Sequence, residues 1–251
     1  MEAISHYSID QECIMKKFKK SIALWAPLQL IMMVFMPLPA LSASGQSEKQ
    51  EEAMKSESMD MASEKTMMSF PEGMETAVFA GGCFWGVEAV FEGLQGVENV
   101  VSGYSGGSAD TASYYSVGAG NTGHAESVEI VFNPETIDFE TLLEVFFTVA
   151  HDPTQLNYQG PDVGSEYRSV VFYTSEDQKA STMRMIEKLD SQMVFPEKIV
   201  TELAPLDTFY PAEDYHQDFM KLNPNHGYIV YWDRPKIVEL EKKYPHLLMM
   251  E

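Results

Sequence analysis

A pair of glycines followed by a cysteine sits between two segments of opposite pattern and fixes how this part of the chain can fold. Residues 76–80 are apolar enough for a strand, and residues 87–91 carry a helical pattern. The glycines before Cys83 permit a sharp turn. A helix that begins there directs unpaired N–H groups at the sulfur, which favours the thiolate. A buried structural cysteine is the alternative, but it would not need flanking glycines. The segment therefore predicts a strand–turn–helix unit with a reactive thiol.

The motif Gly82-Cys83-Phe84-Trp85-Gly86 resembles the signature of the A-type peptide methionine sulfoxide reductases. Further motifs of that family follow in the family's order: Gly103-Tyr104-Ser105-Gly106-Gly107, Thr122-Gly123-His124-Ala125-Glu126, His151-Asp152-Pro153-Thr154, residues 159–169 and Ala212-Glu213-Asp214-Tyr215-His216-Gln217. The resemblance covers roughly residues 76–231. Six motifs in one order make it far more specific than a lone cysteine motif.

Strand and helix patterns alternate along the chain, which predicts one α+β domain with a mixed or antiparallel sheet. The resemblance implies a two-layer ferredoxin-like sandwich with extra helices. Beyond the first unit, the patterns predict strands over residues 97–104, 127–132, 169–173 and 198–203. They predict helices over residues 138–150, 175–189, 212–220 and 234–243, with Asp138 and Ser175 able to cap two of them.

A thiolate at Cys83 could attack a disulfide, a carbonyl, a peroxide or a sulfoxide. Sulfoxide reduction also needs a proton donor, because the sulfoxide oxygen must take up protons. Glu126 fits if burial beside the thiolate raises its pKa. From the residues alone, an exposed charge at the end of a strand is the more economical interpretation of Glu126. The resemblance favours the acid.

The resemblance also implies roles for other side chains. Phe84 and Trp85 would form the apolar slot for the substrate's methyl group. Tyr114 and Tyr167 would bind the sulfoxide oxygen, with Tyr115 as a competing choice for the first. Asp162 would hold a network of water and hydroxyl groups. We therefore expect reduction of methionine (S)-sulfoxide, in proteins or free, through a sulfenic acid on the cysteine.

The N-terminal region predicts export. A basic segment with Lys16, Lys17, Lys19 and Lys20 precedes an uncharged apolar stretch over residues 21–41, and small residues follow it. Residues 1–43 are therefore interpreted as a signal peptide, with an uncleaved anchor over residues 21–41 as the alternative. The true start could be Met1 or Met15. Residues 44–70 predict a flexible, acidic, Met-rich lead-in, and residues 71–251 the catalytic domain. The mature protein would be periplasmic or extracellular.

Cysteine usage limits how the enzyme can be recycled. The chain has two cysteines, and Cys13 lies before or within the predicted signal peptide. Cys83 would then be the sole thiol of the exported protein, which rules out an internal disulfide and a cysteine-based zinc site. The tail lacks the further cysteines of many relatives. We therefore expect a one-cysteine variant with no cofactor or metal, recycled by an external thioredoxin-like or small-thiol reductant.

The charge balance excludes some partners. The chain has 17 Lys and Arg residues against 38 Asp and Glu residues, for a formal net charge of −21. Nucleic acid and anionic membranes would repel such a surface. We expect a monomer that acts on oxidised proteins or free methionine sulfoxide. Two other functions stay open from the residues: a non-catalytic thiol and methionine oxidant sink, and a cysteine hydrolase.

Overall fold

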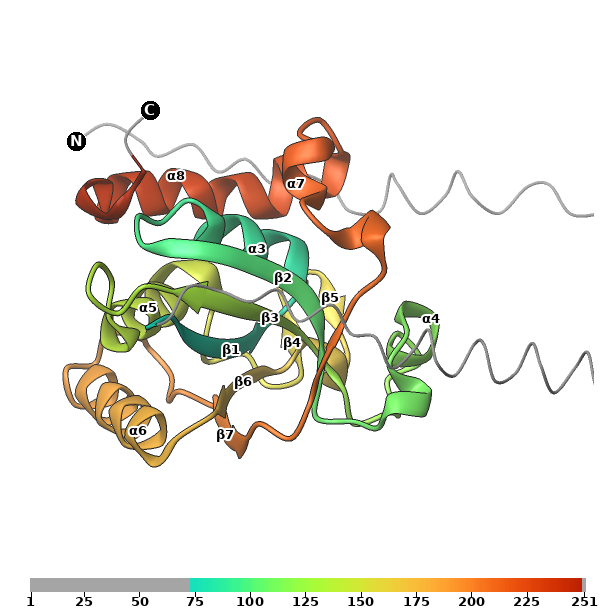
Figure 1. The fold of residues 1–251 in the computed structure, drawn as a ribbon, viewed down its shortest axis with the longest axis horizontal. Coiled ribbons are helices and arrows are strands. Elements are labelled where there is room, and N and C mark those ends of the chain that lie inside the picture. The colour runs from blue at the N-terminus through green and yellow to red at the C-terminus, as the bar shows by residue number, and fades with distance from the viewer. Residues whose placement is uncertain (1–72, 250–251) are drawn as a thin grey trace, which may run out of the picture. The chain divides into compact units, whose positions relative to one another are not determined.

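Six strands form a single mixed sheet at the centre of the domain (Figure 1). The computed structural model describes residues 73–249, so the predicted signal peptide and lead-in lie outside the described residues. The strand order is β7-β6-β1-β3-β2-β8. Neighbouring strands are antiparallel except β6 and β7, which are parallel. The bounds are β1 Glu75–Gly81, β2 Val97–Ser105, β3 Ala125–Phe132, β6 Ser169–Tyr173, β7 Glu202–Pro205 and β8 Phe209–Pro211.

Helices and a small hairpin surround this sheet. The helix that follows the cysteine, α3, packs between the sheet and the C-terminal helix α8 (Figure 1). Helix α6 packs against α5 and β6, away from α3 and α8. The helices are α3 Phe84–Glu92, α4 Tyr114–Val117, α5 Phe139–Val145, α6 Glu176–Ser191, α7 Phe219–Leu222 and α8 Arg234–Lys243. Two π-helical turns, Phe146–Ala150 and Ile229–Asp233, continue α5 and precede α8. Strands β4 Tyr158–Gln159 and β5 Asp162–Val163 form the hairpin.

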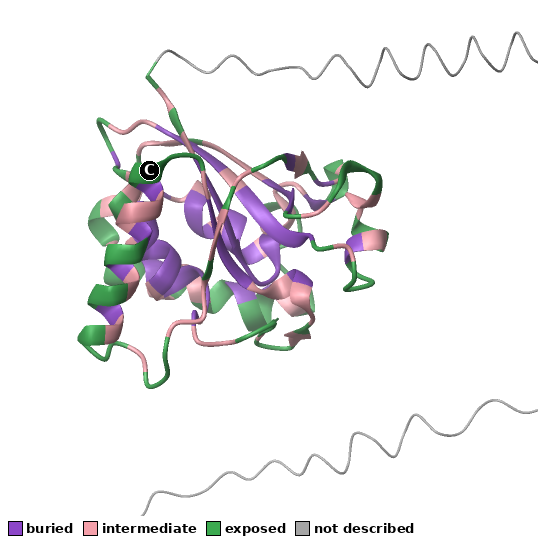
Figure 2. Ribbon diagram, turned by 90° about the horizontal axis from the view of Figure 1, so that it is seen from below, coloured by how far each residue is buried: buried purple, intermediate pink, exposed green. Residues whose placement is uncertain are grey.

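The core lies on both sides of β1, whose residues are buried along most of its length. Figure 2 shows the central strands of the domain mostly buried. Phe79 stacks on Phe146 with 4.7 Å between ring centroids and contacts Phe91 of α3 at 5.6 Å. These contacts fix α3 and the turn after α5 against the sheet through apolar burial. The end of β1, where the cysteine follows, is therefore a rigid position.

The predicted α+β class and the mixed sheet with covering helices are confirmed. The predicted caps are confirmed too. Asp138 accepts a hydrogen bond from the Thr141 N–H at 2.8 Å, and Ser175 accepts one from the Gln178 N–H at 3.2 Å. These side chains satisfy donors that the first turn of a helix leaves unpaired.

Two predicted elements differ in the structure. The strand predicted over residues 198–203 is the later β7. The helix predicted over residues 212–220 is a 3₁₀ turn, Asp214–His216, followed by α7. Asp218 has a φ of 52°, which a helix cannot contain. The Gln217 side chain bonds the Ser102 backbone instead, at 2.9 Å to each of its N–H and carbonyl groups, which fastens this segment to β2.

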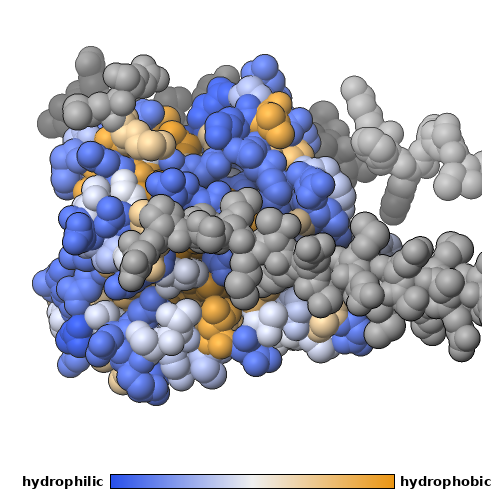
Figure 3. Space-filling model, viewed as in Figure 1, coloured by the Kyte–Doolittle hydropathy of each residue, from blue (hydrophilic) through white to orange (hydrophobic). Residues whose placement is uncertain are grey.

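The surface in Figure 3 is mostly hydrophilic over the described residues, with a few apolar patches. This distribution agrees with the strongly acidic charge balance of the sequence. Within residues 73–249, no helix has the length and apolar character needed to cross a membrane.

Candidate active site

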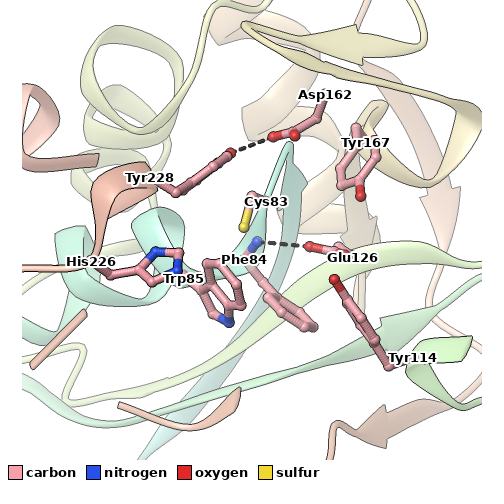
Figure 4. A pocket seen from close by; sticks show the side chains of 9 residues that line it. All are labelled: Cys83, Phe84, Trp85, Tyr114, Glu126, Asp162, Tyr167, His226 and Tyr228. Carbon is pink, nitrogen blue, oxygen red and sulfur yellow. Dashed lines mark hydrogen bonds between the residues drawn. The ribbon is translucent and has the colours of Figure 1, made fainter. Parts of the chain in front are cut away.

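A cavity of about 240 Å³ lies where β1 ends and α3 begins. Nine residues line it, drawn in Figure 4: Cys83, Phe84, Trp85, Tyr114, Glu126, Asp162, Tyr167, His226 and Tyr228. All seven residues that the sequence singled out are among them. They come from the start of α3, from α4, β3 and β5, and from the 3₁₀ turn Ser165–Tyr167. The fold therefore gathers residues 84 positions apart in the chain, from Cys83 to Tyr167, around one space.

Cys83 is the residue that caps the N-terminus of α3. The turn before it depends on Gly82, whose φ of 88° suits glycine and whose Cα lies against Gln159, so a Cβ there would come within 2.5 Å of that side chain. Figure 4 shows the sulfur in the middle of the lining side chains. The Trp85 N–H of the first helical turn is directed at the sulfur. The predicted strand–turn–helix geometry is therefore present.

The prediction of an easily ionised thiol was wrong. Burial raises the pKa of Cys83 well above its ordinary value, and the nearby carboxylates of Glu126 and Asp233 raise it further. The Trp85 N–H and the Lys236 ammonium lower this pKa, but they do not offset the loss of water. The N–H group at the helix start therefore lowers the pKa as expected, but the cysteine is only 8% exposed and burial has the larger effect.

Glu126 is buried on β3 and is not the exposed strand-end charge of the alternative interpretation. Its Oε2 accepts a hydrogen bond from the Phe84 N–H at 3.1 Å, which ties the carboxyl to the first turn of α3 (Figure 4). Burial raises the pKa of Glu126 to about 8, and the charges of Asp162 and Glu166 act in the same direction. Near neutral pH the carboxyl is mostly protonated, so it can donate a proton.

Two phenols complete the polar side of the cavity. The hydroxyl groups of Tyr114 and Tyr167 point toward Glu126 in Figure 4. Burial and the charge of Glu126 raise the pKa of both phenols, so both hydroxyls stay protonated and can donate hydrogen bonds. The neighbouring Tyr115 is 93% exposed, so of the two adjacent tyrosines only Tyr114 lines the cavity.

The apolar wall consists of Phe84 and Trp85. The Trp85 ring stacks on Phe219 of α7, with 3.8 Å between centroids and an interplanar angle of 11°. Its Nε1–H donates to His216 Nδ1 at 3.1 Å. His216 also packs on Phe84 and Tyr114, at 5.1 and 4.4 Å between centroids. His216 therefore supports the wall from behind and does not line the cavity.

Sequence reasoning missed His226 and Tyr228, which line the cavity from the segment before α8. The Tyr228 hydroxyl donates to Asp162 Oδ2, and burial raises the pKa of both groups. An aromatic residue after Gly227 in a polar tail was the available signal.

The donors needed for a metal do not gather in this part of the chain. Over residues 73–249, no group of three or more His, Cys, Asp or Glu side chains is placed to hold a metal ion. Cys83 is the free cysteine within the same range.

Comparison with known proteins identifies the family. Residues 75–247 match the peptide methionine sulfoxide reductase family. The chain is 53% identical over 175 residues to peptide methionine sulfoxide reductase MsrA 2 of Mesorhizobium japonicum, and the aligned residues cover 70% of this chain and 90% of that protein. It is 50% identical over 172 residues to peptide methionine sulfoxide reductase MsrA 2 of Synechocystis sp., and the aligned residues cover 68% of this chain and 80% of that protein.

Solved structures agree. The fold is similar to reduced Mxr1 of Saccharomyces cerevisiae, with a TM-score of 0.58 and 32% identity over 64% of this chain and 92% of that one. It is also similar to methionine sulfoxide reductase A of Corynebacterium diphtheriae, with a TM-score of 0.54 and 33% identity, over 62% of this chain and 77% of that one. The chain therefore belongs to the peptide methionine sulfoxide reductase family, whose members are oxidoreductases that reduce methionine sulfoxide.

Proposed function

We propose that this enzyme reduces the S epimer of methionine sulfoxide, and that Cys83 and Glu126 carry the reaction. The observation that supports this most directly is the presence of a thiol and a mostly neutral carboxyl in one cavity, both tied to the first turn of α3. Cys83 Sγ attacks the substrate sulfur while Glu126 protonates the sulfoxide oxygen. A neutral Glu126 also removes one of the charges that oppose ionisation of the thiol.

The products follow from the balance of atoms and electrons. The sulfoxide loses its oxygen and becomes a thioether, which is a two-electron reduction. Cys83 gains that oxygen and becomes a sulfenic acid, which is a two-electron oxidation. The thiol proton ends on the sulfenic oxygen, and the proton that Glu126 lends returns to it.

Placement of the substrate follows from the two sides of the cavity. Tyr114 and Tyr167 would donate hydrogen bonds to the sulfoxide oxygen, and Phe84 and Trp85 would receive the methyl group. Asp162 would order water and hydroxyl groups, held by Tyr228. Because polar and apolar walls are distinct, only one epimer can present its oxygen and its methyl group correctly at once.

The test uses the two epimers of a methyl sulfoxide separately, with dithiothreitol as reductant. We expect turnover of the S epimer only, and equal use of the R epimer would contradict the proposal. Turnover also separates the enzyme from a stoichiometric oxidant sink, and an ester and amide panel tests for a hydrolase. After one equivalent of sulfoxide without reductant, dimedone should label the Cys83 peptide stoichiometrically.

For recycling, we propose an external thiol, either a small thiol or a thioredoxin-like protein. With Cys83 as the sole thiol of an exported chain, the reductant must reach the sulfur through the mouth of the cavity. Turnover with thioredoxin and its reductase, compared with dithiothreitol, tests this. Failure of both reductants to regenerate the thiol would contradict direct attack on Cys83.

We propose that the protein is exported to the periplasm or the exterior and that the signal peptide is cleaved near residue 43. We also propose that the mature protein is a monomer. N-terminal sequencing of the cellular product should begin near Ser44. A product that begins at Met1 or Met15 would favour the anchor. A monomeric mass is expected in light scattering.

We further propose that the central elements form a two-layer ferredoxin-like sandwich. Support comes from the chain order β1-α3-β2-β3-α5-β6 and from the order β6-β1-β3-β2 of the four central strands. Strands β7 and β8 would then be additions at the two edges.

A further inference from the structure

A buried ion pair lies beneath the first turn of α3. Asp233, at the end of the π-helical turn, has a fully buried side chain, and the Lys236 side chain in the first turn of α8 is 17% exposed. Lys236 Nζ lies 3.1 Å from Asp233 Oδ1. Asp233 Oδ2 has no hydrogen-bond partner within residues 73–249. Burying two charges costs desolvation, so a pair in this position calls for a functional explanation.

Gly86 shows how close the pair comes to the nucleophile. A Cβ on Gly86 would overlap Asp233 Oδ1 and would lie 2.7 Å from Lys236 Nζ. Gly86 has no positive φ, so it is needed for space and not for backbone conformation. It lies three positions after Cys83, in the first turn of the helix whose N-terminus Cys83 caps. The ammonium therefore lies against the same first turn of α3 that follows the thiol.

The other charged or titratable groups around Cys83 are mainly acids. Glu126 faces the cavity from β3 and Asp162 from β5, whereas Asp233 lies outside the cavity, against Gly86 of α3. The phenols in the cavity are Tyr114, Tyr167 and Tyr228, and His226 lies beside Trp85. Lys236 acts in the opposite direction, because its charge lowers the pKa of Cys83, Asp162 and Asp233. Its ammonium is therefore well placed to stabilise a negative sulfur.

We propose that Lys236 is a positioning residue for the reaction: Asp233 fixes its ammonium beneath Gly86, and there the positive charge stabilises the thiolate of Cys83 during attack. This inference rests on the proposed role of Cys83 as nucleophile. It assigns different parts to the two members of the pair. Lys236 favours the thiolate, whereas Asp233 anchors the ammonium and by its own charge opposes the thiolate.

The experiment measures the rate at which iodoacetamide alkylates Cys83 as a function of pH, read on the Cys83 peptide by mass spectrometry. Lys236→Gln keeps a donor for Asp233 but removes the charge. Its alkylation midpoint should rise by about one pH unit or more, with a rate about tenfold lower at pH 8, since a close opposite charge shifts a pKa by about 1–3 units.

Two controls separate charge from fold. Lys236→Arg keeps the charge and should keep the midpoint of the unchanged enzyme. Lys242→Met removes an exposed lysine from the same helix and should have no effect. If Lys236→Gln does not fold, Lys236→Met serves the same comparison. Circular dichroism verifies folding in each case.

An unchanged midpoint in a folded Lys236→Gln or Lys236→Met enzyme would overturn the inference. Alkylation involves neither a sulfoxide nor proton donation. A failure here is therefore distinct from a failure of the epimer and dimedone tests, which address the proposed function itself.

Discussion

Replacing Glu126 by Gln tests the acid through protein stability. The pKa of Glu126 is raised from 4.5 to about 8 by burial. The folded protein therefore binds this proton more tightly than the unfolded chain, and stability is lost as pH rises from about 4.5 through 8. Between pH 6 and pH 9 this loss corresponds to about two pH units of titration, or about 3 kcal/mol, at about 1.4 kcal/mol per unit.

Gln has nearly the same shape and cannot ionise, and its oxygen can still accept from the Phe84 N–H. Relative to the unchanged enzyme, Glu126→Gln should gain about 3 kcal/mol more in unfolding free energy at pH 9 than at pH 6. Urea unfolding followed by tryptophan fluorescence at both pH values measures this. Glu98→Gln, an exposed site on the neighbouring strand β2, is the matched control. An equal difference at both pH values would refute the argument.

Activity should depend on the same protonation of Glu126. With a pKa of about 8, roughly nine tenths of the Glu126 carboxyls are protonated at pH 7 and about one tenth at pH 9. The rate should therefore fall as pH rises through 8. Glu126→Gln should slow reduction by about two to four decades and abolish that decline. A variant that keeps the decline would show that another group is the acid.

Three further substitutions give separate outcomes. Cys83→Ser should abolish turnover in the dithiothreitol assay, because a serine hydroxyl is scarcely ionised; retained turnover would mean another nucleophile. Gly86→Ala should lower the unfolding free energy by about 1–3 kcal/mol in urea, since the new methyl group overlaps Asp233 Oδ1; an unaffected protein would place the ion pair elsewhere. Tyr228→Phe removes a donor to Asp162 and should raise the pKa of that carboxyl further, measurable by carboxyl NMR titration; a lowered pKa would contradict the hydrogen bond.

Local patterns were sufficient where one segment carries its own signal. The two glycines before Cys83 predicted the turn, and Asp138 and Ser175 predicted two helix starts, because turn and cap preferences act over a few residues. The family motifs predicted Glu126 as well. Its burial did not follow from its neighbours in sequence, since it depends on strands packed from both sides.

Features made by distant segments could not be predicted in this way. Tyr228 and Lys236 lie more than a hundred residues after Cys83 in the chain. They come close to the start of α3 only because α8 and the π-helical turn before it pack on α3. Asp218 interrupts a periodic pattern by adopting a positive φ that suits the docking of Gln217 on β2. The raised pKa of Cys83 likewise reflects three-dimensional burial, which outweighs the local effect of the helix start.

The hydrogen bond between Trp85 and His216 fixes an imidazole tautomer. An indole N–H can only donate, so Nδ1 of His216 carries no proton and the neutral ring holds its proton on Nε2. Burial lowers the pKa of this histidine, which keeps the ring neutral. Nitrogen-15 shifts distinguish the two ring nitrogens, so one labelled histidine reports whether the indole wall is in place. Acidification that protonates Nδ1 must break the hydrogen bond from the indole, so this contact of the wall has an acid limit.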